Sequence, residues 1–311
     1  MKTYDAHHLH KKTAQQLAYL AEGLIPLGIA GDIYSPPDTG KTTILLSLLS
    51  AVANRESHWF EFKLIGGRVA FVGGEKSDES VWVRDIQRAT KGIHDPGQFI
   101  IYDLTNDHDE DEALWAWTGK EWVETAEYQI LLEQLKVYRP VVTVLDTISC
   151  VAFGSEPIDN MQQIQLANKV RKFQRLVGGT LLTISHTNQS SQADILTNRL
   201  HYTSRSGANG YPGRLRWLLG MSNLTTSEKE VLGIDQYSKV VAIGVSKHNE
   251  MPMPMPCGNR FNPLLLEITK TGEVVRVIKN CTDVEMPSRR ENMKAKTSAQ
   301  SRKAVNKNAS Y

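Results

Sequence analysis

A short stretch near the start of the chain combines the residue types that bind a polyphosphate. It reads Ser35-Pro36-Pro37-Asp38-Thr39-Gly40-Lys41-Thr42-Thr43. Backbone N–H groups at a helix N-terminus hold phosphate oxygens, a lysine supplies positive charge, and the hydroxyl that follows it binds Mg²⁺. We therefore predict that this stretch binds ATP, with Lys41 on the β- and γ-phosphates and Thr42 as a magnesium ligand.

The residues on either side favour a phosphate-binding loop over an ordinary turn. Residues 28–34 are typical of a strand, and residues 42–49 place apolar side chains at helical spacing. The order strand, loop, helix is the context that this motif requires. Two positions depart from the usual pattern, because Ser35 stands where the first glycine is normally found and Asp38 adds a negative charge. Ser35 can serve in the loop if its backbone is extended rather than left-handed.

A second candidate magnesium ligand, Asp146, ends a strongly apolar stretch. Residues 141–146 read Val-Val-Thr-Val-Leu-Asp, which is typical of a central parallel strand that is buried on both faces. A carboxylate at the end of such a strand can complete the magnesium shell through water. The alternative interpretation is that Asp146 caps a following helix.

Two further polar residues follow predicted strands. Glu75 comes shortly after the strand at residues 68–72 and could orient and deprotonate the attacking water. His186 ends the strand at residues 179–186 and could sense the γ-phosphate. The alternatives are a surface acid in a turn for Glu75 and a hydrogen-bonded core histidine for His186.

The elements that must position these residues alternate along the chain. The strands are separated by helical stretches, including residues 80–89 and a crossover helix at residues 164–176. This alternation predicts an α/β fold with a mostly parallel central sheet and helices on both faces. Residues 239–245 and 264–268 predict antiparallel strands at the sheet edge. Residues 17–20 look like the end of a short helix.

Composition limits the class of protein. The 311 residues are 41% hydrophobic and 23% charged, which suffices for one large α/β core. Three widely spaced cysteines, Cys150, Cys257 and Cys281, form no metal-binding or redox pair. No stretch resembles an export signal or a membrane span, so we expect a cytoplasmic protein without membrane contact.

Charge is distributed unevenly. The net charge is +2, but residues 284–311 hold seven Lys and Arg against two Glu, leaving the remainder slightly acidic. We expect an N-terminal arm at residues 1–16, an ATPase domain at residues 17–283 and a basic, disordered tail at residues 284–311. The tail either keeps the protein soluble or makes a loose nucleic-acid contact.

Together these residues resemble the hexameric RepA-type replicative helicases of broad-host-range plasmids, within the wider class of RecA-like ATPases. The likeness covers roughly residues 20–275. Its sharpest stretches, besides the phosphate loop, are Val144-Leu145-Asp146-Thr147, Arg214-Leu215-Arg216-Trp217 and Gly244-Val245-Ser246-Lys247-His248-Asn249. The resemblance implies a RecA-like P-loop NTPase core and a hexameric ring in which each ATP lies between two subunits. It also matches Glu75 to the family's catalytic glutamate and His186 to its histidine after the third core strand.

An ATP site between subunits needs a cation from the neighbour to stabilise charge on the γ-phosphate. Arg205 matches the arginine that opens the family's Arg-Gly-Ser segment, although the order here is Arg205-Ser206-Gly207. Arg216 matches the arginine before the family's aromatic residue, and Lys247 is a further candidate. The alternative for all three is an ordinary charge on the surface or at a strand end.

The resemblance further implies that single-stranded DNA passes through the ring along residues 153–162 and 188–203. The first segment is acidic, and the second offers only Arg199 and His201 as cations. Phe153 and Tyr202 are the aromatic residues available for base stacking. The DNA partner is therefore expected from the resemblance more than from these residues.

Our leading hypothesis is an ATP-driven, ring-forming DNA helicase or DNA motor in plasmid, phage or mobile-element replication, with a primase or initiator protein as a partner. A second hypothesis is an ATP-switched regulator or assembly protein that oligomerises on DNA or on a partner without unwinding. Ser35, Asp38 and the weakly basic segments favour it. A third is a recombination mediator that forms open filaments rather than rings.

Overall fold

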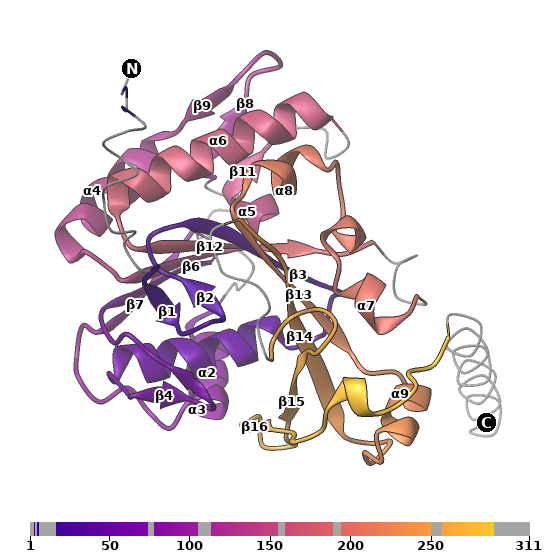
Figure 1. The fold of residues 1–311 in the computed structure, drawn as a ribbon. Coiled ribbons are helices and arrows are strands. Elements are labelled where there is room, and N and C mark those ends of the chain that lie inside the picture. Colours follow the sequence, from indigo (N-terminus) through magenta and orange to yellow (C-terminus); the bar gives the residue numbers. More distant parts are fainter. Residues whose placement is uncertain are drawn as a thin grey trace, which may run out of the picture.

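The computed structural model describes residues 3, 5, 17–73, 78–104, 113–154, 159–188, 194–249 and 257–288. These residues form a nine-stranded sheet with the strand order β16-β15-β14-β13-β3-β12-β10-β6-β7 (Figure 1). Its strands are β3 (Ala30–Ser35), β6 (Val69–Gly73), β7 (Phe99–Asp103), β10 (Val142–Asp146), β12 (Thr180–His186), β13 (Trp217–Asn223), β14 (Lys239–His248), β15 (Leu264–Ile268) and β16 (Val274–Arg276).

The sheet is mostly parallel, as predicted. The six strands β13, β3, β12, β10, β6 and β7 lie in that order and pair in parallel. Beyond β13, the strands β14, β15 and β16 are added in antiparallel pairs. Parallel strands bring their carboxyl ends to one edge of the sheet, where ligands bind in open α/β folds. Here β3, β10 and β12 end in Ser35, Asp146 and His186. The edge is therefore polar at three neighbouring strands.

Helices cover both faces of the sheet, which confirms the predicted α/β class (Figure 1). Helices α2 (Lys41–Ala53) and α3 (Glu79–Ala89) lie on one face, and α4 (Ala126–Tyr138), α6 (Asn160–Val177) and α8 (Gly210–Arg214) lie on the other. Two hydrophobic clusters separate them from the sheet. Strand β3 contributes alternately, with Ile33 in one cluster and Ala30 and Tyr34 in the other.

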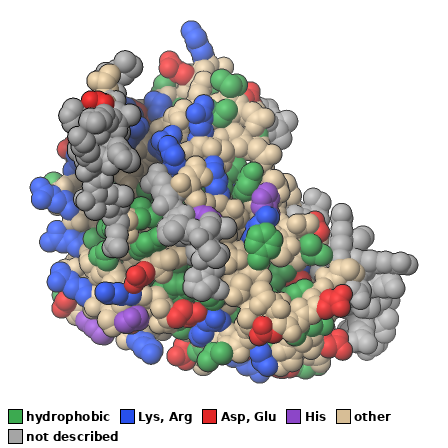
Figure 2. All heavy atoms as spheres, viewed as in Figure 1, with side chains coloured by type: hydrophobic (Ala, Val, Ile, Leu, Met, Phe, Trp, Pro, Cys, Tyr) green, Lys and Arg blue, Asp and Glu red, His purple; other side chains and the backbone are tan. Residues whose placement is uncertain are grey.

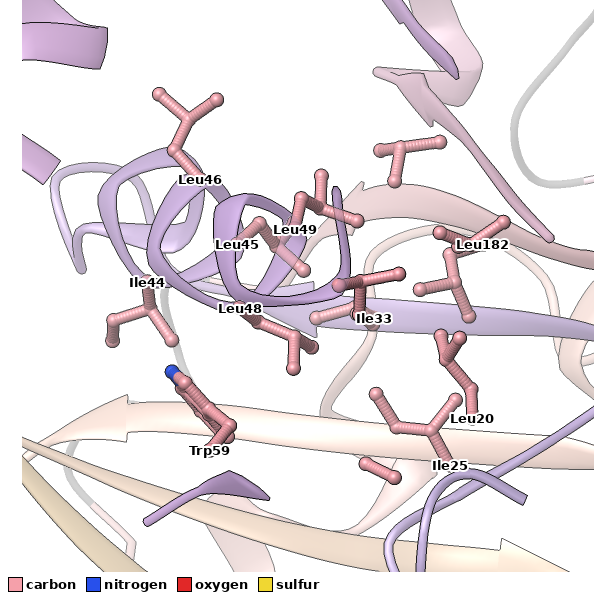
Figure 3. Packing of buried hydrophobic residues seen from close by; sticks show 14 of the residues in the cluster. Leu20, Ile25, Ile33, Ile44, Leu45, Leu46, Leu48, Leu49, Trp59 and Leu182 are labelled. Carbon is pink, nitrogen blue, oxygen red and sulfur yellow. The ribbon is translucent and has the colours of Figure 1, made fainter. Parts of the chain in front are cut away.

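Helix α2 is held by a run of buried leucines and an isoleucine. Figure 3 shows Leu45, Leu48 and Leu49 of α2 near Ile33 of β3 and Leu182 of β12. Burial of a leucine side chain contributes about 1.5–3 kcal/mol. Several such side chains therefore fix the start of α2 against the strands that carry the polar edge.

Smaller elements complete the fold. They are β1 (Tyr19–Ala21), β2 (Ile25–Pro26), β4 (His58–Trp59), β5 (Phe62–Lys63), β8 (Trp115–Trp117), β9 (Trp122–Glu124), β11 (Ala152–Phe153), α5 (Ile148–Val151), α7 (Leu196–Arg199), α9 (Thr226–Val231), η2 (Tyr202–Ser204) and η3 (Cys281–Asp283). The predicted helix end at residues 17–20 is wrong. Tyr19 and Ala21 pair with β2 across a tight turn in which Gly23 has φ 73°, so the segment is a short ribbon with Leu20 buried beneath it.

The predicted arm at residues 1–16 and the end of the predicted tail lie almost entirely outside the described residues. The domain limits at residues 16 and 283 therefore remain predictions. Within the described part of the chain, no helix combines the length and apolar character needed to cross a bilayer.

Candidate nucleotide-binding site

The phosphate loop leaves the sheet at Ser35 without backbone strain. Ser35 is the last residue of β3, is fully buried, and has extended backbone rather than a positive φ. Its hydroxyl donates to the Pro36 carbonyl oxygen at 2.8 Å. A glycine is therefore not required at this position, and the departure from the usual motif is accommodated.

The loop turns through two left-handed residues. Asp38 has φ 57° and is exposed, and aspartate is among the residues that tolerate this conformation. Gly40 has φ 94°, and a Cβ atom there would lie 2.2 Å from Ile268 Cδ1. Thr39 closes the turn by donating its hydroxyl to the Pro36 carbonyl oxygen at 2.7 Å. The positive φ therefore favours glycine at position 40, and a larger residue there would also displace the end of the Ile268 side chain.

Helix α2 begins directly after Gly40. The first helical hydrogen bond runs from the Ile44 N–H to the Gly40 carbonyl oxygen at 3.0 Å. The N–H groups of the first turn have no partner within a helix and can hold an anion. Lys41 opens the helix with 8% of its surface exposed.

Thr42 and Asp146 meet at the polar edge of the sheet. The Thr42 hydroxyl donates to Asp146 Oδ2 at 3.2 Å, and Asp146 is 5% exposed. A hydroxyl and a carboxylate are oxygen ligands that Mg²⁺ prefers, usually together with substrate phosphates and water. The two residues are 104 positions apart in the chain, and their contact fits the predicted magnesium pair.

Lys41 and His186 form a second contact in the same place. Lys41 Nζ lies 3.4 Å from His186 Nδ1 at the end of β12. His186 is therefore next to the side chain that would hold the terminal phosphates. Helix α2 and strands β10 and β12 together bring four predicted site residues to one edge.

Arg205 has a different environment from the one expected. Its Nε donates to Asp32 Oδ2 at 3.0 Å, with Arg205 5% exposed and Asp32 fully buried. The hydroxyls of Thr183 and Ser185 donate to Asp32 Oδ1 at 2.7 and 2.8 Å. Arg205 is thus committed inside its own chain, and in this position it is not offered to a neighbouring subunit.

The Asp32–Arg205 pair is connected to His186 through the backbone of the residue after Arg205. The Ser206 N–H donates to the His186 carbonyl oxygen at 2.8 Å, and the Arg205 guanidinium lies 4.6 Å from the centre of the Tyr211 ring. Burial raises the pKa of Asp32, and the Arg205 charge and the two hydroxyls oppose this rise. An acid within an apolar strand signals such a partner, because an unpaired buried carboxylate is costly. The sequence interpretation did not use that signal.

Arg216 and Lys247 lie at the opposite edge of the sheet. Trp217, directly after Arg216, pairs with Gly31 at the amino end of β3, and Lys247 pairs with Leu218. The Lys247 ammonium donates to the carbonyl oxygens of Pro212 and Gly213 at 3.0 and 2.9 Å. Burial lowers the pKa of Lys247, and the charge of Arg216 lowers it further. The length of β3 separates both cations from the phosphate loop of the same chain.

A family model described as an AAA domain matches residues 2–192, which is more than half of the chain. The chain belongs to the AAA domain family. This membership makes it a P-loop ATPase and agrees with nucleotide binding by residues 35–43. The matched segment includes Asp146 and His186 but ends before Arg205 and the C-terminal strands. No curated protein matches the chain.

Glu75 of the AAA domain lies outside the described residues. The strand that leads to it, β6, ends at Gly73, which pairs directly with Asp146. The chain therefore approaches Glu75 from a position beside the candidate magnesium ligand. The role of Glu75 remains a prediction.

The two segments expected to contact DNA contain fewer available cations than their sequence indicates. Arg199 is 3% exposed and pairs with the buried Glu228 at 2.7 Å, so its charge is committed inside the same chain. Burial lowers the pKa of His201, which favours its neutral form. Residues 155–158 and 189–193 of these segments lie outside the described residues. Figure 2 shows acidic side chains beside basic ones over the lower half of the face seen there.

Proposed function

We propose that this AAA-domain ATPase is a ring-forming DNA helicase or DNA motor that acts in plasmid, phage or mobile-element replication. One observation carries the proposal: the phosphate loop lies at one edge of the sheet, and Arg216 and Lys247 lie at the other. Arg216 or Lys247 can therefore stabilise a γ-phosphate only in the site of a second subunit. Identical subunits joined in this head-to-tail manner close into a ring when their rotation allows it.

The roles of the residues within one subunit follow from their contacts. Lys41 would hold the terminal phosphates of ATP, and Thr42 with Asp146 would hold Mg²⁺. The bound metal would neutralise charge on the phosphate oxygens. Glu75 is the proposed base for water, and His186, beside Lys41, is the proposed sensor of the γ-phosphate. The resemblance to RepA-type helicases supports six subunits and a primase or initiator partner.

The proposal is tested first by steady-state ATP hydrolysis with and without single-stranded DNA. A motor that couples hydrolysis to movement should be stimulated severalfold by DNA. The Lys41→Ala variant provides the blank, because it removes the phosphate cation. Strand displacement and imaging of rings would follow a positive result.

A second candidate function is an ATP-switched regulator that assembles on DNA or on a partner without unwinding. The buried Arg199–Glu228 pair favours it, because this pair removes one of the two sequence-predicted cations from the DNA segments. A slow ATPase that is indifferent to DNA would support the regulator. Open polymers instead of closed rings would support a recombination mediator.

Mixing two inactive variants tests whether the site is shared. Lys41→Ala lacks the phosphate cation, and Arg216→Ala lacks the cation offered to the neighbour. In an equal mixture, about one quarter of the interfaces join an intact phosphate loop to an intact Arg216, so about one quarter of wild-type hydrolysis should return. Hydrolysis is measured after the subunits have exchanged.

The matched control mixes Lys41→Ala with Asp146→Asn. Both changes damage the same half of the site, so no interface regains a complete set of residues. Recovery in the first mixture alone supports sharing between subunits. If neither mixture recovers although both assemble, Arg216 does not complete a neighbour's site.

A further inference from the structure

A cavity of about 320 Å³ lies beside the phosphate site. It lies between α5 and β11 on one side, α6 on another, and the end of β12 with residues 205–207 on the third. We propose that this cavity binds a single nucleobase of single-stranded DNA. This proposal rests on the proposed function, because it assumes that DNA is the partner.

Gln163 points to a ligand with both hydrogen-bond donors and acceptors. It lines the cavity and is 7% exposed, yet its carboxamide has no hydrogen-bond partner among the described residues. Gln174 on the same helix is equally buried at 8% but donates to the carbonyl oxygens of Gly28 and Gly179 at 3.0 and 2.8 Å. Gln163 keeps a small exposed surface beside the cavity, so a bound ligand can supply the hydrogen bonds that the described residues do not. The edge of a nucleobase supplies the donor and acceptor that Gln163 lacks.

The other walls favour a flat, uncharged ring. Ile148, Ala152 and Leu166 provide apolar surface, and Phe153 lines the cavity while remaining 71% exposed. Exposed aromatic rings are platforms on which bases of single strands stack. The volume falls at the lower end of the range of about 300–1,000 Å³ for small-molecule pockets.

The charges around the cavity argue against a phosphate as its occupant. Arg205 and His186 are the basic side chains that line it among the described residues. The Arg205 guanidinium is already paired with Asp32 at 3.0 Å, and His186 faces Lys41 through Nδ1 at 3.4 Å. A site for phosphate would instead present a cation to the ligand. The base is therefore the part of DNA that this cavity suits.

The position of His186 gives the cavity a link to ATP turnover. His186 lines the cavity and also contacts Lys41 of the phosphate loop. A base bound here would touch a residue that is itself in contact with the phosphate cation. Occupancy of the cavity by DNA thus provides a physical route for DNA to change the rate of hydrolysis.

The test compares a short oligothymidylate with an oligonucleotide of the same length whose sugars lack bases. The full-length chain should bind the oligothymidylate about tenfold more tightly, which is about 1.4 kcal/mol. The Gln163→Leu variant keeps the size of the side chain but removes the amide, so this preference should shrink to about twofold. Ala152→Leu, which fills the cavity, should do the same. Fluorescence anisotropy measures each affinity.

Gln165→Leu is the matched control, because Gln165 is on the same helix but lines a different surface groove with Trp122 and Lys169. This variant should keep the tenfold preference, and all three variants should keep hydrolysis without DNA. An undiminished preference in both Gln163→Leu and Ala152→Leu overturns the proposal. Tight binding of free thymidine, together with equal affinity for the two oligonucleotides, would also overturn the proposal.

The binding and hydrolysis measurements distinguish an error in the cavity proposal from an error in the proposed function. Equal, salt-sensitive binding of both oligonucleotides with DNA-stimulated hydrolysis would overturn the cavity and leave a DNA motor that contacts the backbone. Absence of binding to either oligonucleotide, with hydrolysis indifferent to DNA, would overturn both.

Discussion

The Lys41→Ala variant is expected to lose ATP hydrolysis by roughly 10²- to 10³-fold, the scale of removing one group that stabilises transition-state charge. Lys41 opens α2, and its Nζ lies 3.4 Å from His186 Nδ1 at the polar edge of the sheet. The charge that it brings to the terminal phosphates cannot be supplied by Arg216 or Lys247 of the same chain, which lie at the opposite edge.

The fold should survive this change. Helix α2 is fixed by Leu45, Leu48 and Leu49 rather than by Lys41 (Figure 3). Circular dichroism and steady-state hydrolysis of the purified variant separate the two effects. Lys136→Ala is a suitable control, since Lys136 is exposed and paired with Glu133 on α4. Unchanged hydrolysis in folded Lys41→Ala would remove the assignment of the phosphate site.

The second large effect is on stability: Arg205→Ala should lower the free energy of unfolding by about 3–5 kcal/mol. Arg205 and Asp32 are both buried, and removal of the guanidinium leaves the carboxylate with only the Thr183 and Ser185 hydroxyls. Arg205→Ala also removes the guanidinium that packs over the Tyr211 ring. Urea unfolding followed by tryptophan fluorescence measures the loss.

A double variant distinguishes the buried charge from lost packing. Asp32→Asn together with Arg205→Met removes both charges while keeping side chains of similar size. Because replacing both members of a buried ion pair is often close to neutral, this variant should recover most of the stability that Arg205→Ala loses. Equal instability of the two variants would show that packing around Arg205, rather than the unpaired Asp32, is responsible.

The loss in Arg205→Ala should also depend on pH. Burial raises the pKa of Asp32, and the variant lacks the guanidinium that opposes this rise. Between the ordinary carboxyl pKa and the raised value in the folded state, the folded state binds more protons than the unfolded chain. Stability of the variant must therefore fall as pH rises through that window, so the difference from wild type should be larger at neutral than at acid pH. A difference independent of pH would mean that Asp32 finds another partner.

The AAA-domain match covers only part of the sheet, and the strands that follow the matched segment also contact the phosphate loop. The matched residues 2–192 contain the phosphate loop, Asp146 and His186. The antiparallel strands β14 and β15 follow this segment, and Ile268 of β15 packs against Gly40 of the phosphate loop. The C-terminal strands therefore support the nucleotide site of the same chain at one end. At the other end they carry Lys247 at the edge where a neighbour would lie in the proposed ring.

The sequence by itself determined the α/β class, the phosphate loop and the strand-end position of Asp146. These features are local: a parallel strand buried on both faces shows as an apolar run, and the loop shows as fixed residue types between a strand and a helix. Most strand positions followed for the same reason. The ribbon at Tyr19–Ala21 did not, because a three-residue strand has too few positions to show a period.

The tertiary structure alone decided which charges are available. Arg205 and Arg199 look like surface cations in the sequence, but their partners Asp32 and Glu228 lie 173 and 29 positions away. The pairing of β3 with β12 brings Asp32 under Arg205, and the contact of Thr42 with Asp146 likewise needs strands that are distant in the chain. A long-range ion pair depends on chain topology rather than on residue type, so local patterns could not reveal which arginines remain free to act.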